Sequence, residues 1–541
     1  MISANHRPAA VASLVFLIML VAEIGAIVLL NHGHFAYVID DPYIHLALSE
    51  RIAHGHYGLN PDETVAPSSS ILWPFLLAPF AWFEWHALVP LAFCSLAAVA
   101  ALFAAGRLLS EISVSASPIP SARSAILLIA LIFVLAMPLH ALSGMEHLPH
   151  VAVTAIAAVG LIILVTRSEP PWWLYIALLL SPALRYEGVS ILLAGTAALA
   201  LNGRPRSAAA TLVAGLLPFV IFGSFLMSNG LPPIPSSLLV KSPVHSTNFT
   251  GAVVSILQVV QTNLLFERTG LVLALLTVIC VLKAPRPQGE GILAWAVCLV
   301  TGIYFVEGYP VTLGRYSLFV STFAIFIAVF LWRRELARFA GRSGPFQFAA
   351  ATAVAVMLFN PAQIKLMAVA PIMANNNWQQ QHQLARFLIE FWRRPAAFTE
   401  LGRMSYENSN YVLDLWGLGS EEARTLRLNH APDWLNQITR ERNIGLALIY
   451  DDWFEGLIPH QWRRVGVLEI SRTNMVLPSP RISIYATSSA EVEDIESALM
   501  AFEPTLPAGT NLVFEGVNRK AYARKSSRCG TTAPLVNCSV E

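Results

Sequence analysis

The chain has 541 residues, of which 55% are hydrophobic and only 13% are charged. A soluble protein of this size carries about 25% charged residues. The formal net charge is +1, which argues against a nucleic-acid partner. Runs of about 20 apolar residues recur along the chain, and this is the length needed to cross the hydrocarbon core of a bilayer. The composition therefore predicts a polytopic α-helical membrane protein.

Eleven apolar runs predict membrane-spanning helices: 11–30, 88–106, 124–142, 147–166, 172–184, 187–202, 208–228, 268–283, 291–306, 312–332 and 346–368. A cytoplasmic N-terminus satisfies the positive-inside rule, because it places these cations in cytoplasmic loops: Arg107, Arg123, Arg167, Arg204, Arg206, Lys283, Arg286, Arg333, Arg334, Arg338 and Arg342. The first run contains Glu23 and lacks a small-residue cleavage site, so we expect a retained helix rather than a removed signal peptide.

The apolar stretch Ile71–Phe83 is treated differently from the eleven runs. It is too short to span the bilayer comfortably and contains Pro74 and Pro79. We therefore expect an interfacial or re-entrant helix within a first outer loop at 31–87. If this stretch crossed the membrane, every later loop would change side and the arginine clusters would lie outside.

The sequence predicts two domains, a transmembrane domain at 1–369 and an outer soluble domain at 370–541. Helical patterns in the second domain alternate with short apolar strands, which favours an α/β fold. The expected helices are Gln381–Trp392, Glu421–Leu428, Asp433–Arg442 and Ala490–Phe502, and the expected strands are Tyr411–Leu415, Gly445–Tyr450, Arg464–Ile470, Arg481–Thr487 and Asn511–Glu515. Cys529 and Cys538 close a short loop near the C-terminus, and an outer, oxidising compartment would allow a disulfide between them.

Two adjacent carboxylates, Asp40 and Asp41, follow the first span and precede an expected amphipathic helix from Pro42 to His56. A carboxylate within hydrogen-bond reach of a hydroxyl acts as a general base. The alternative role is that of a helix N-cap, in which an aspartate accepts hydrogen bonds from free backbone N–H groups. A charged pair beside a bilayer is costly, so function is the favoured interpretation.

Four other outer-face segments carry unusual polar residues. Glu146 lies between two spans, where it either binds an acceptor or a cation or begins the next helix. Arg185 and Glu187 interrupt a long apolar stretch and either pair within a simple turn or expose an arginine to a phosphate. A proline-rich loop ends at Lys241, which either contacts a phosphate or extends to the interface. Arg315 and Tyr316 begin a late span on the same side.

Several histidines crowd the first loop, but no recognised metal-ligand spacing emerges among them. Solvent-exposed or interfacial roles are favoured for His32, His34, His45, His54 and His56. No cofactor is expected to be required, although the carboxylates leave room for a divalent cation, which prefers oxygen ligands.

These motifs together resemble those of bacterial GT-C glycosyltransferases, in particular the arabinofuranosyltransferase-like branch that uses polyprenyl-phosphate sugars. The resembling segments are Asp40–Ala47, Asn60–Glu63, Ser68–Trp73, Ser143–Glu146, Arg185–Gly188, Gly230–Lys241, Gly314–Tyr316 and Asp414–Leu418. Two departures are visible: Tyr186 replaces the usual proline, and Ile234–Ser237 replaces an Asn-Thr pair.

The resemblance implies a GT-C-like membrane enzyme that transfers a sugar, with inversion, from a polyprenyl-phosphate donor to an envelope glycan or lipid acceptor. Asp40 would be the best candidate for the base, and Asp41 its partner or an acceptor-binding group. The implied ligands of the donor phosphate are Arg185, Lys241 and Arg315, and the implied substrate-binding residues are Glu146, Glu187, Tyr43, His45 and Tyr316. The reaction would take place on the outer face of a bacterial inner membrane.

The main alternative from another class is a transporter or flippase of lipid-linked saccharides. Transporters usually place polar sites near the membrane midplane and show inverted repeats. The spans of this chain are poor in charge, and no repeat is visible in its sequence. A membrane-anchored binding protein is a third interpretation, but it leaves the loop carboxylates unexplained. A polymer ligase or polymerase acting on polyprenyl-linked substrates is compatible with the composition.

Overall fold

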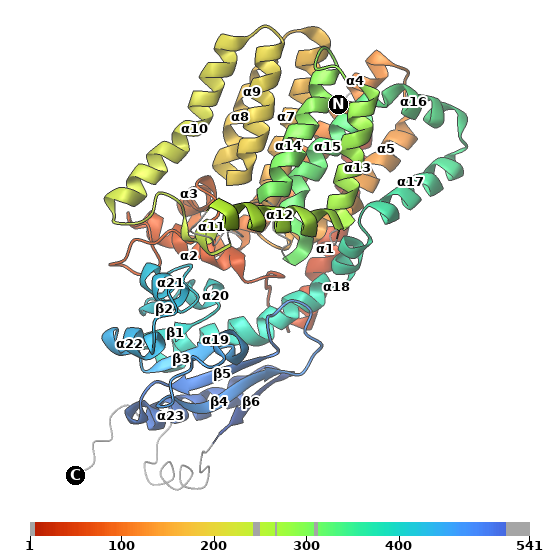
Figure 1. Ribbon diagram of the computed structural model, residues 1–541. Helices are drawn as coiled ribbons and strands as arrows, with labels where there is room; N and C mark the ends of the chain where they lie inside the picture. Colours follow the sequence, from red (N-terminus) through yellow and green to blue (C-terminus); the bar gives the residue numbers. More distant parts are fainter. Residues whose placement is uncertain (1–5, 242–248, 266–267, 308–311, 516–541) are drawn as a thin grey trace, which may run out of the picture.

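The computed structural model describes residues 6–241, 249–265, 268–307 and 312–515. A bundle of long helices occupies one half of the molecule, and an α/β domain lies below its lower end (Figure 1). The bundle helices are α1 (Arg7–Leu30), α4 (Val89–Ser115), α5 (Ser121–Val134), α6 (Met137–Ala141), α7 (His147–Arg167), α8 (Trp172–Leu184), α9 (Val189–Leu201), α10 (Pro205–Ser228), α13 (Arg268–Lys283), α14 (Gly291–Glu307), α15 (Leu318–Leu331), α16 (Arg333–Arg342) and α17 (Pro345–Phe359).

Within the described residues, five helices are long and apolar enough to cross a membrane, and up to seven if each of two bent helix pairs counts as one span. Shorter apolar helices occupy four more of the predicted runs, at Ser121–Val134, Trp172–Leu184, Tyr186–Leu201 and Gly291–Glu307. The prediction of a polytopic helical protein is confirmed, whereas the count of eleven spans is not. Ile71–Phe83 forms only α3 (Leu72–Leu77) and the short η2 (Ala78–Phe80), and it is not among the candidate spans of the described residues.

Two predicted segments differ from the structure. The run 346–368 is not one continuous helix, because α17 and the helix beginning at Pro361 meet at an angle of 84°. Pro361 lacks a backbone N–H and disfavours the helical conformation of Asn360, so a break at this point is expected chemically. The helix α18 (Pro361–Asn377) continues through η6 (Trp378–His382) and α19 (Gln383–Arg386) to η7 (Phe387–Trp392), which leads into the soluble domain.

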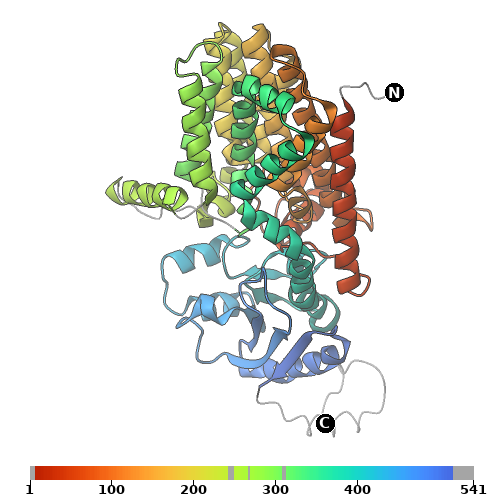
Figure 2. The same cartoon turned by 90° about the vertical axis from the view of Figure 1, so that its right-hand side faces the viewer.

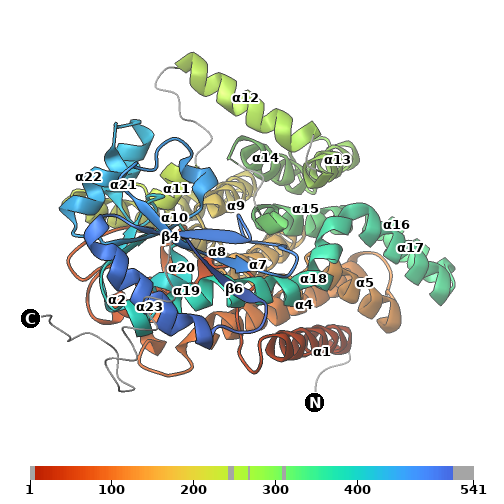
Figure 3. The ribbon, with the colours of Figure 1, turned by 90° about the horizontal axis from the view of Figure 1, so that it is seen from below.

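The predicted outer loop Gly230–Glu267 contains helices among its described residues. It contains α11 (Ser236–Lys241) and the uncharged helix α12 (Phe249–Leu265). Helix α12 runs roughly perpendicular to the bundle helices and projects beyond them (Figure 2). The view from below shows the same helix reaching past the edge of the α/β domain (Figure 3).

The C-terminal domain is built on a mixed six-stranded sheet of order β2-β1-β3-β5-β4-β6. Its strands are β1 (Ala396–Phe398), β2 (Val412–Asp414), β3 (Leu446–Ile449), β4 (Arg463–Ile470), β5 (Arg481–Ala486) and β6 (Thr510–Phe514). Strands β2, β1 and β3 are parallel, and the other pairs are antiparallel. The predicted helices correspond to the η6–η7 segment, α21 (Glu421–Leu428), α22 (Trp434–Glu441) and α23 (Val492–Phe502). The predicted α/β pattern is confirmed, and the elements that the sequence did not predict include the three-residue β1 and the four-residue helix α20 (Gly402–Ser405).

The α/β domain joins the first outer loop at its sheet edge. The side-chain amide of Asn60 donates to Val412 O and accepts from Val412 N, both at 2.9 Å. Asn60 thereby satisfies backbone groups of the edge strand β2 that would otherwise lack a partner. Glu63 accepts from Tyr411 Oη at 2.8 Å and pairs with Arg442 at 2.5 Å. These contacts fix the amino end of β2 beside the first loop.

Candidate active site

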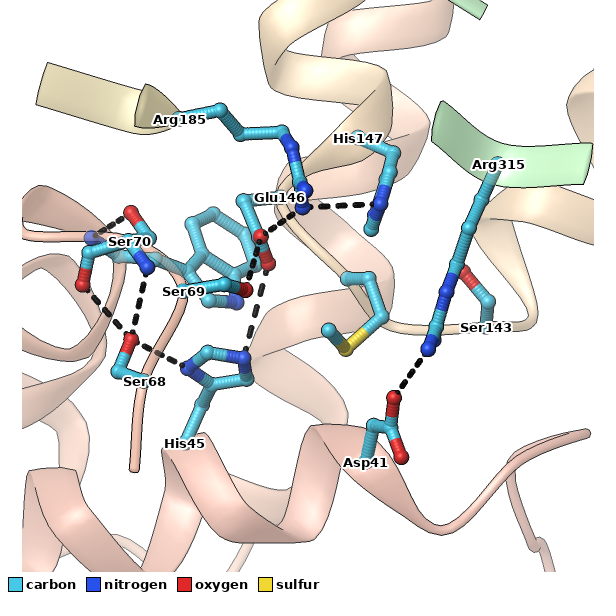
Figure 4. Close-up of polar contacts among 12 residues, drawn as sticks. Asp41, His45, Ser68, Ser69, Ser70, Ser143, Glu146, His147, Arg185 and Arg315 are labelled. Carbon is cyan, nitrogen blue, oxygen red and sulfur yellow. Dashed lines mark hydrogen bonds and ion pairs between the residues drawn. The ribbon is translucent and has the colours of Figure 1, made fainter. Parts of the chain in front are cut away.

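The helix α2 (Asp41–Ala53) lies between the bundle and the α/β domain and matches the predicted helix within three residues at its C-terminal end. Pro42 lies in its first turn, where the missing N–H costs nothing and the fixed φ suits a helix. At 100° per residue, Asp41 and His45 share one face, whereas Tyr43 and Glu50 lie on the opposite face. The first face is directed toward the bundle, as Figure 4 shows for Asp41 and His45.

Asp41 forms an ion pair with Arg315, with 2.5 Å between Asp41 Oδ2 and Arg315 Nη2. The Arg315 side chain is only 7% exposed, whereas the Asp41 side chain is 31% exposed. The arginine comes from η5 (Thr312–Ser317), directly before α15. A partly exposed carboxylate is therefore held by a buried guanidinium group.

A second cluster surrounds Arg185, which follows α8. Its Nη1 donates to Glu146 Oε1 at 2.5 Å and lies 2.9 Å from His147 Nε2, while Nη2 and Nε donate to Glu187 at 2.7 and 3.2 Å (Figure 4 shows the first two contacts). Glu146 is fully buried and Arg185 is 2% exposed. Buried ionic groups need such partners, because an isolated charge would be strongly destabilising.

Tyr316 connects the two arginines. Its ring centroid lies 4.7 Å from the guanidinium carbon of Arg185 and 5.7 Å from that of Arg315. His147 stacks against the same ring with an interplanar angle of 14°. Cations over an aromatic face are stabilised by its quadrupole. The two guanidinium groups and three carboxylates therefore form one continuous polar region at the end of the bundle that faces the α/β domain.

The first loop closes this region from below. Ser69 Oγ donates to Glu146 Oε1 at 3.1 Å, and His45 Nε2 lies 3.6 Å from Glu146 Oε2. The other ring nitrogen of His45 lies 3.1 Å from Ser68 Oγ (Figure 4). The serine run Ser68–Ser70 and helix α2 thus meet the start of α7 at Glu146.

The turn before α7 requires a glycine at position 144. Gly144 adopts a φ of +63°, and a Cβ at this position would lie 2.6 Å from a ring carbon of Tyr37. Only glycine accepts both the left-handed conformation and this close approach. The turn brings Glu146 to the N-cap position of α7 and directs its carboxylate toward Arg185.

Asp40 has different surroundings from Asp41. It is 8% exposed, and its two carboxylate oxygens accept from the backbone N–H groups of Gly402 and Arg403 at 2.7 and 2.8 Å. Burial raises the pKa of the Asp40 carboxyl to about 6, against the opposing effect of the hydrogen bond from Arg403 N–H. Asp40 therefore contacts the α/β domain rather than the Arg185 and Arg315 region.

The structure brings together seven of the predicted site residues: Asp41, His45, Glu146, Arg185, Glu187, Arg315 and Tyr316, the last of which lies between the two cations. Tyr43 lies on the other face of α2, where its hydroxyl is 2.9 Å from His382 Nε2. The expected phosphate contact of the Lys241 side chain and the expected Cys529–Cys538 disulfide lie outside the described residues. Among the described residues, no group of three or more His, Cys, Asp or Glu side chains is arranged to hold a metal ion.

Sequence reasoning missed several residues of this region. His147 was not among the predicted site residues, although it contacts both Arg185 and Tyr316. Gly402 and Arg403 received no attention, because nothing local in the sequence indicates that their backbone meets Asp40, 362 positions earlier. A signal did exist for Ser69, since three consecutive serines before an apolar run are unusual beside a membrane.

Comparisons with known proteins give limited matches. A family model described as a domain of unknown function (DUF8728) matches residues 371–487, which lie in the C-terminal part of the chain. No curated protein sequence matches the chain. The structure is similar to the Archaeoglobus fulgidus oligosaccharyltransferase in its apo form, at 12% identity and a TM-score of 0.46, covering 88% of this chain and 75% of that chain.

Two further structures of the Archaeoglobus fulgidus oligosaccharyltransferase show comparable similarity. The complex with Zn and sulfate has 12% identity and a TM-score of 0.43, covering 91% of this chain and 74% of that chain. The complex with an inhibitory peptide and a dolichol-phosphate has 10% identity and a TM-score of 0.41, covering 92% and 75%.

Proposed function

We propose that this chain is an inverting, GT-C-type membrane glycosyltransferase that transfers a sugar from a polyprenyl-phosphate donor to a glycan or lipid acceptor. The observation that carries the proposal is the ion pair between Asp41 and Arg315 at the outer end of the bundle. A carboxylate suited to accept a proton lies beside a cation suited to hold a phosphate. Inverting transfer needs the base on one face of the anomeric carbon and the phosphate-binding cation on the other, so Asp41 and Arg315 separate when the donor enters between them.

Of the two aspartates, Asp41 is the favoured base. Its side chain is 31% exposed, so an acceptor hydroxyl has access to it. Asp40 is buried and already accepts two backbone hydrogen bonds. A general base must lie within hydrogen-bond reach of the proton that it removes. This assignment reverses the preference for Asp40 that the sequence motif alone suggested.

The proposed reaction forms one bond and breaks one bond at the anomeric carbon of the donor sugar. The acceptor hydroxyl transfers its proton to Asp41 while its oxygen bonds to the anomeric carbon of the donor sugar. The bond between that carbon and the phosphate oxygen breaks, and polyprenyl phosphate leaves with the electron pair. Arg315 exchanges its contact with Asp41 for the phosphate, whose developing charge it stabilises.

Arg185 is the second cation of the proposed site, and the carboxylates around it are suited to bind sugar hydroxyls. Glu187 is 20% exposed and faces Arg185, whereas Glu146 is fully buried. We therefore assign Glu187, with His45 and Tyr316, to the substrate side and Glu146 to the support of Arg185. Tyr43 supports α2 from the other face, and a role for Lys241 at the donor phosphate remains part of the proposal.

The proposed setting is the outer face of a bacterial inner membrane, with a cytoplasmic N-terminus and the α/β domain outside. The basic residues of the predicted cytoplasmic loops support this orientation. The motif resemblance supports an arabinofuranosyltransferase-like branch, a polyprenyl-phosphate pentose as donor and an envelope glycan or lipid as acceptor. No metal ion is assigned a role in the reaction.

The function is tested with purified protein in lipid nanodiscs and radiolabelled polyprenyl-phosphoryl-arabinofuranose as the donor. Release of polyprenyl phosphate together with labelled glycan on added envelope extract supports the proposal. Loss of that release in Arg315→Gln, with normal folding, links it to the ion pair. Movement of intact donor across proteoliposomes without cleavage would instead favour the flippase alternative.

A further inference from the structure

The C-terminal domain contacts the proposed catalytic helix near both of its ends. The contacting segment begins with α20 (Gly402–Ser405), which follows the carboxyl end of β1, and continues to Asn408. It touches the residue just before α2, one residue in its first turn and two residues in its last turn. This segment lies within residues 371–487, which match the domain of unknown function.

The first contact is at Asp40, which immediately precedes α2. Its carboxylate accepts from the backbone N–H groups of Gly402 and Arg403, the first two residues of α20. A Cβ at position 402 would collide with both the backbone oxygen and the carboxylate of Asp40. A glycine is therefore required for the two backbones to approach this closely.

The second contact is at Tyr43, one turn further along. Its hydroxyl lies 2.9 Å from His382 Nε2 of η6, and the guanidinium carbon of Arg403 lies 5.6 Å from its ring centroid. Arg403 also lies 5.2 Å from the ring of Tyr406 and donates to Tyr406 O at 2.9 Å. Tyr43 is 3% exposed, so it is enclosed between the helix and the α/β domain.

The third contact is at the far end of α2. Glu407 N donates to Glu50 Oε2 at 3.2 Å, and Arg51 Nη2 donates to Asn408 O at 3.3 Å. Three separate points along one short helix fix its position and its rotation about its own axis. A single contact would leave both free to change.

These contacts and the proposed chemistry use opposite faces of α2. Tyr43 and Glu50 are on the face toward the α/β domain, and Asp41 and His45 are on the face toward Arg315 and Glu146. A displacement of the first face therefore moves the second. Displacements of about 1 Å in a reacting group reduce rates by roughly a hundredfold.

We propose that the segment from Gly402 to Asn408 is a positioning clamp for the catalytic helix, with Asp40 and Gly402 as its main positioning residues. This inference rests on the proposed function and assigns a role to the domain of unknown function. The α/β domain then sets the rate of the transfer step by holding Asp41 at the reacting carbon. It contributes little to donor binding, which depends on the bundle cations.

The test compares Gly402→Ala with Gly344→Ala in nanodiscs, using the same polyprenyl-phosphoryl-arabinofuranose donor. Gly344 lies at the other end of the bundle with a φ of −63°, and its nearest neighbour for a new Cβ is at 3.8 Å, so this control adds a methyl group without a collision. Hydrogen exchange of the α2 amides is measured in both variants, because it reports helix mobility without requiring activity. Asp40→Asn serves as a second variant that keeps the side-chain size.

We expect Gly402→Ala to lower kcat at least tenfold. The KM for the donor should change less than about twofold, since the bundle cations are untouched, and the α2 amides should exchange faster. Asp40→Asn should also lower kcat and speed the exchange of the α2 amides. Gly344→Ala should change neither kcat nor the exchange rate. An unchanged α2 exchange in Gly402→Ala and Asp40→Asn would overturn the clamp, whatever happens to kcat. If wild-type protein transfers no sugar but α2 exchange still rises in both variants, the clamp stands and the proposed function fails.

Discussion

Arg315 Nη2 lies 2.5 Å from Asp41 Oδ2, and this contact joins the proposed phosphate ligand to the proposed base. Without substrate, each group neutralises the other. Arg185 is satisfied in a similar way by Glu146 and Glu187. The resting site therefore has two cations and three carboxylates and no excess positive charge. Donor phosphate has to compete with a carboxylate for each arginine.

This competition predicts that Asp41→Asn binds lipid phosphate more tightly than the wild-type protein. Removing the carboxylate charge frees Arg315 for the phosphate, and a gain of about 1.4 kcal/mol corresponds to tenfold tighter binding. The measurement is a titration of undecaprenyl phosphate into protein in nanodiscs. Asp40→Asn is the control, because Asp40 faces the backbone of Gly402 and Arg403. Equal or weaker binding by Asp41→Asn would contradict the competition.

Arg185→Lys should lower both stability and transfer. A lysine has no planar fork to match Glu146 and Glu187 together, so one buried carboxylate loses its partner. Breaking a buried pair costs about 3–5 kcal/mol, which thermal unfolding in detergent detects as a lower Tm. Glu187→Gln should cost less, since that side chain is 20% exposed. Equal decreases in Tm in the two variants would show that the buried pair between Arg185 and Glu146 adds no extra stability.

The stability of the protein should depend on pH through Asp40. Burial raises the pKa of this carboxyl to about 6 from an ordinary 3.8, and the charged groups facing it are Arg403, Asp41 and Glu400. Between about pH 4 and 6 the folded state therefore binds more protons than the unfolded state. The stability contributed by Asp40 falls as pH rises through this window, by up to about 3 kcal/mol.

Asp40→Asn should remove this part of the pH dependence. The measurement is thermal unfolding of both proteins from pH 4 to pH 7.5, with their difference in stability plotted against pH. The wild-type protein should lose stability relative to Asp40→Asn as pH rises to about 6, and the difference should be flat above that value. A difference that grows in the opposite direction would mean that the folded protein lowers this pKa.

Asn60→Ala should loosen the α/β domain from the first loop. Its amide satisfies both Val412 N–H and Val412 C=O at the sheet edge, so its removal leaves two buried backbone groups without partners. Each unsatisfied buried group lowers the free energy of unfolding by about 1–3 kcal/mol. Limited proteolysis should cut the variant faster within the soluble domain. Asn436→Ala, an exposed substitution on α22, should leave the cleavage rate unchanged.

Local patterns in the sequence predicted most of the helices and strands correctly. Apolar runs predicted the bundle helices, and Pro42 predicted the start of α2. Both signals are local, because each depends only on the residues of the helix itself. The short strand β1 and the uncharged helix α12 were missed. The first has three residues and depends on its parallel neighbours β2 and β3, and the second lacks the charge pattern that usually distinguishes an interfacial helix.

The sequence predicted which residues belong to the candidate site, but it did not predict which of them pair with one another. Asp41, Glu146, Arg185 and Arg315 were all named as outer-face residues. Their partners depend on the rotation of α2, which is fixed by contacts with Gly402 and Glu407 more than 350 positions away. The two adjacent aspartates look equivalent in the sequence. Only the fold shows that Asp40 contacts the α/β domain and that Asp41 pairs with Arg315.

The central claim is that Asp41 is the base of a glycosyl transfer. The most direct measurement compares sugar transfer from polyprenyl-phosphoryl-arabinofuranose by purified wild-type, Asp41→Asn and Asp40→Asn proteins in nanodiscs. Loss of a general base costs about 10²–10⁴-fold, so Asp41→Asn should retain at most about 1% of the wild-type rate. Asp40→Asn should retain roughly a tenth, as expected for a positioning residue. Near-normal transfer by Asp41→Asn together with no transfer by Asp40→Asn would contradict the account.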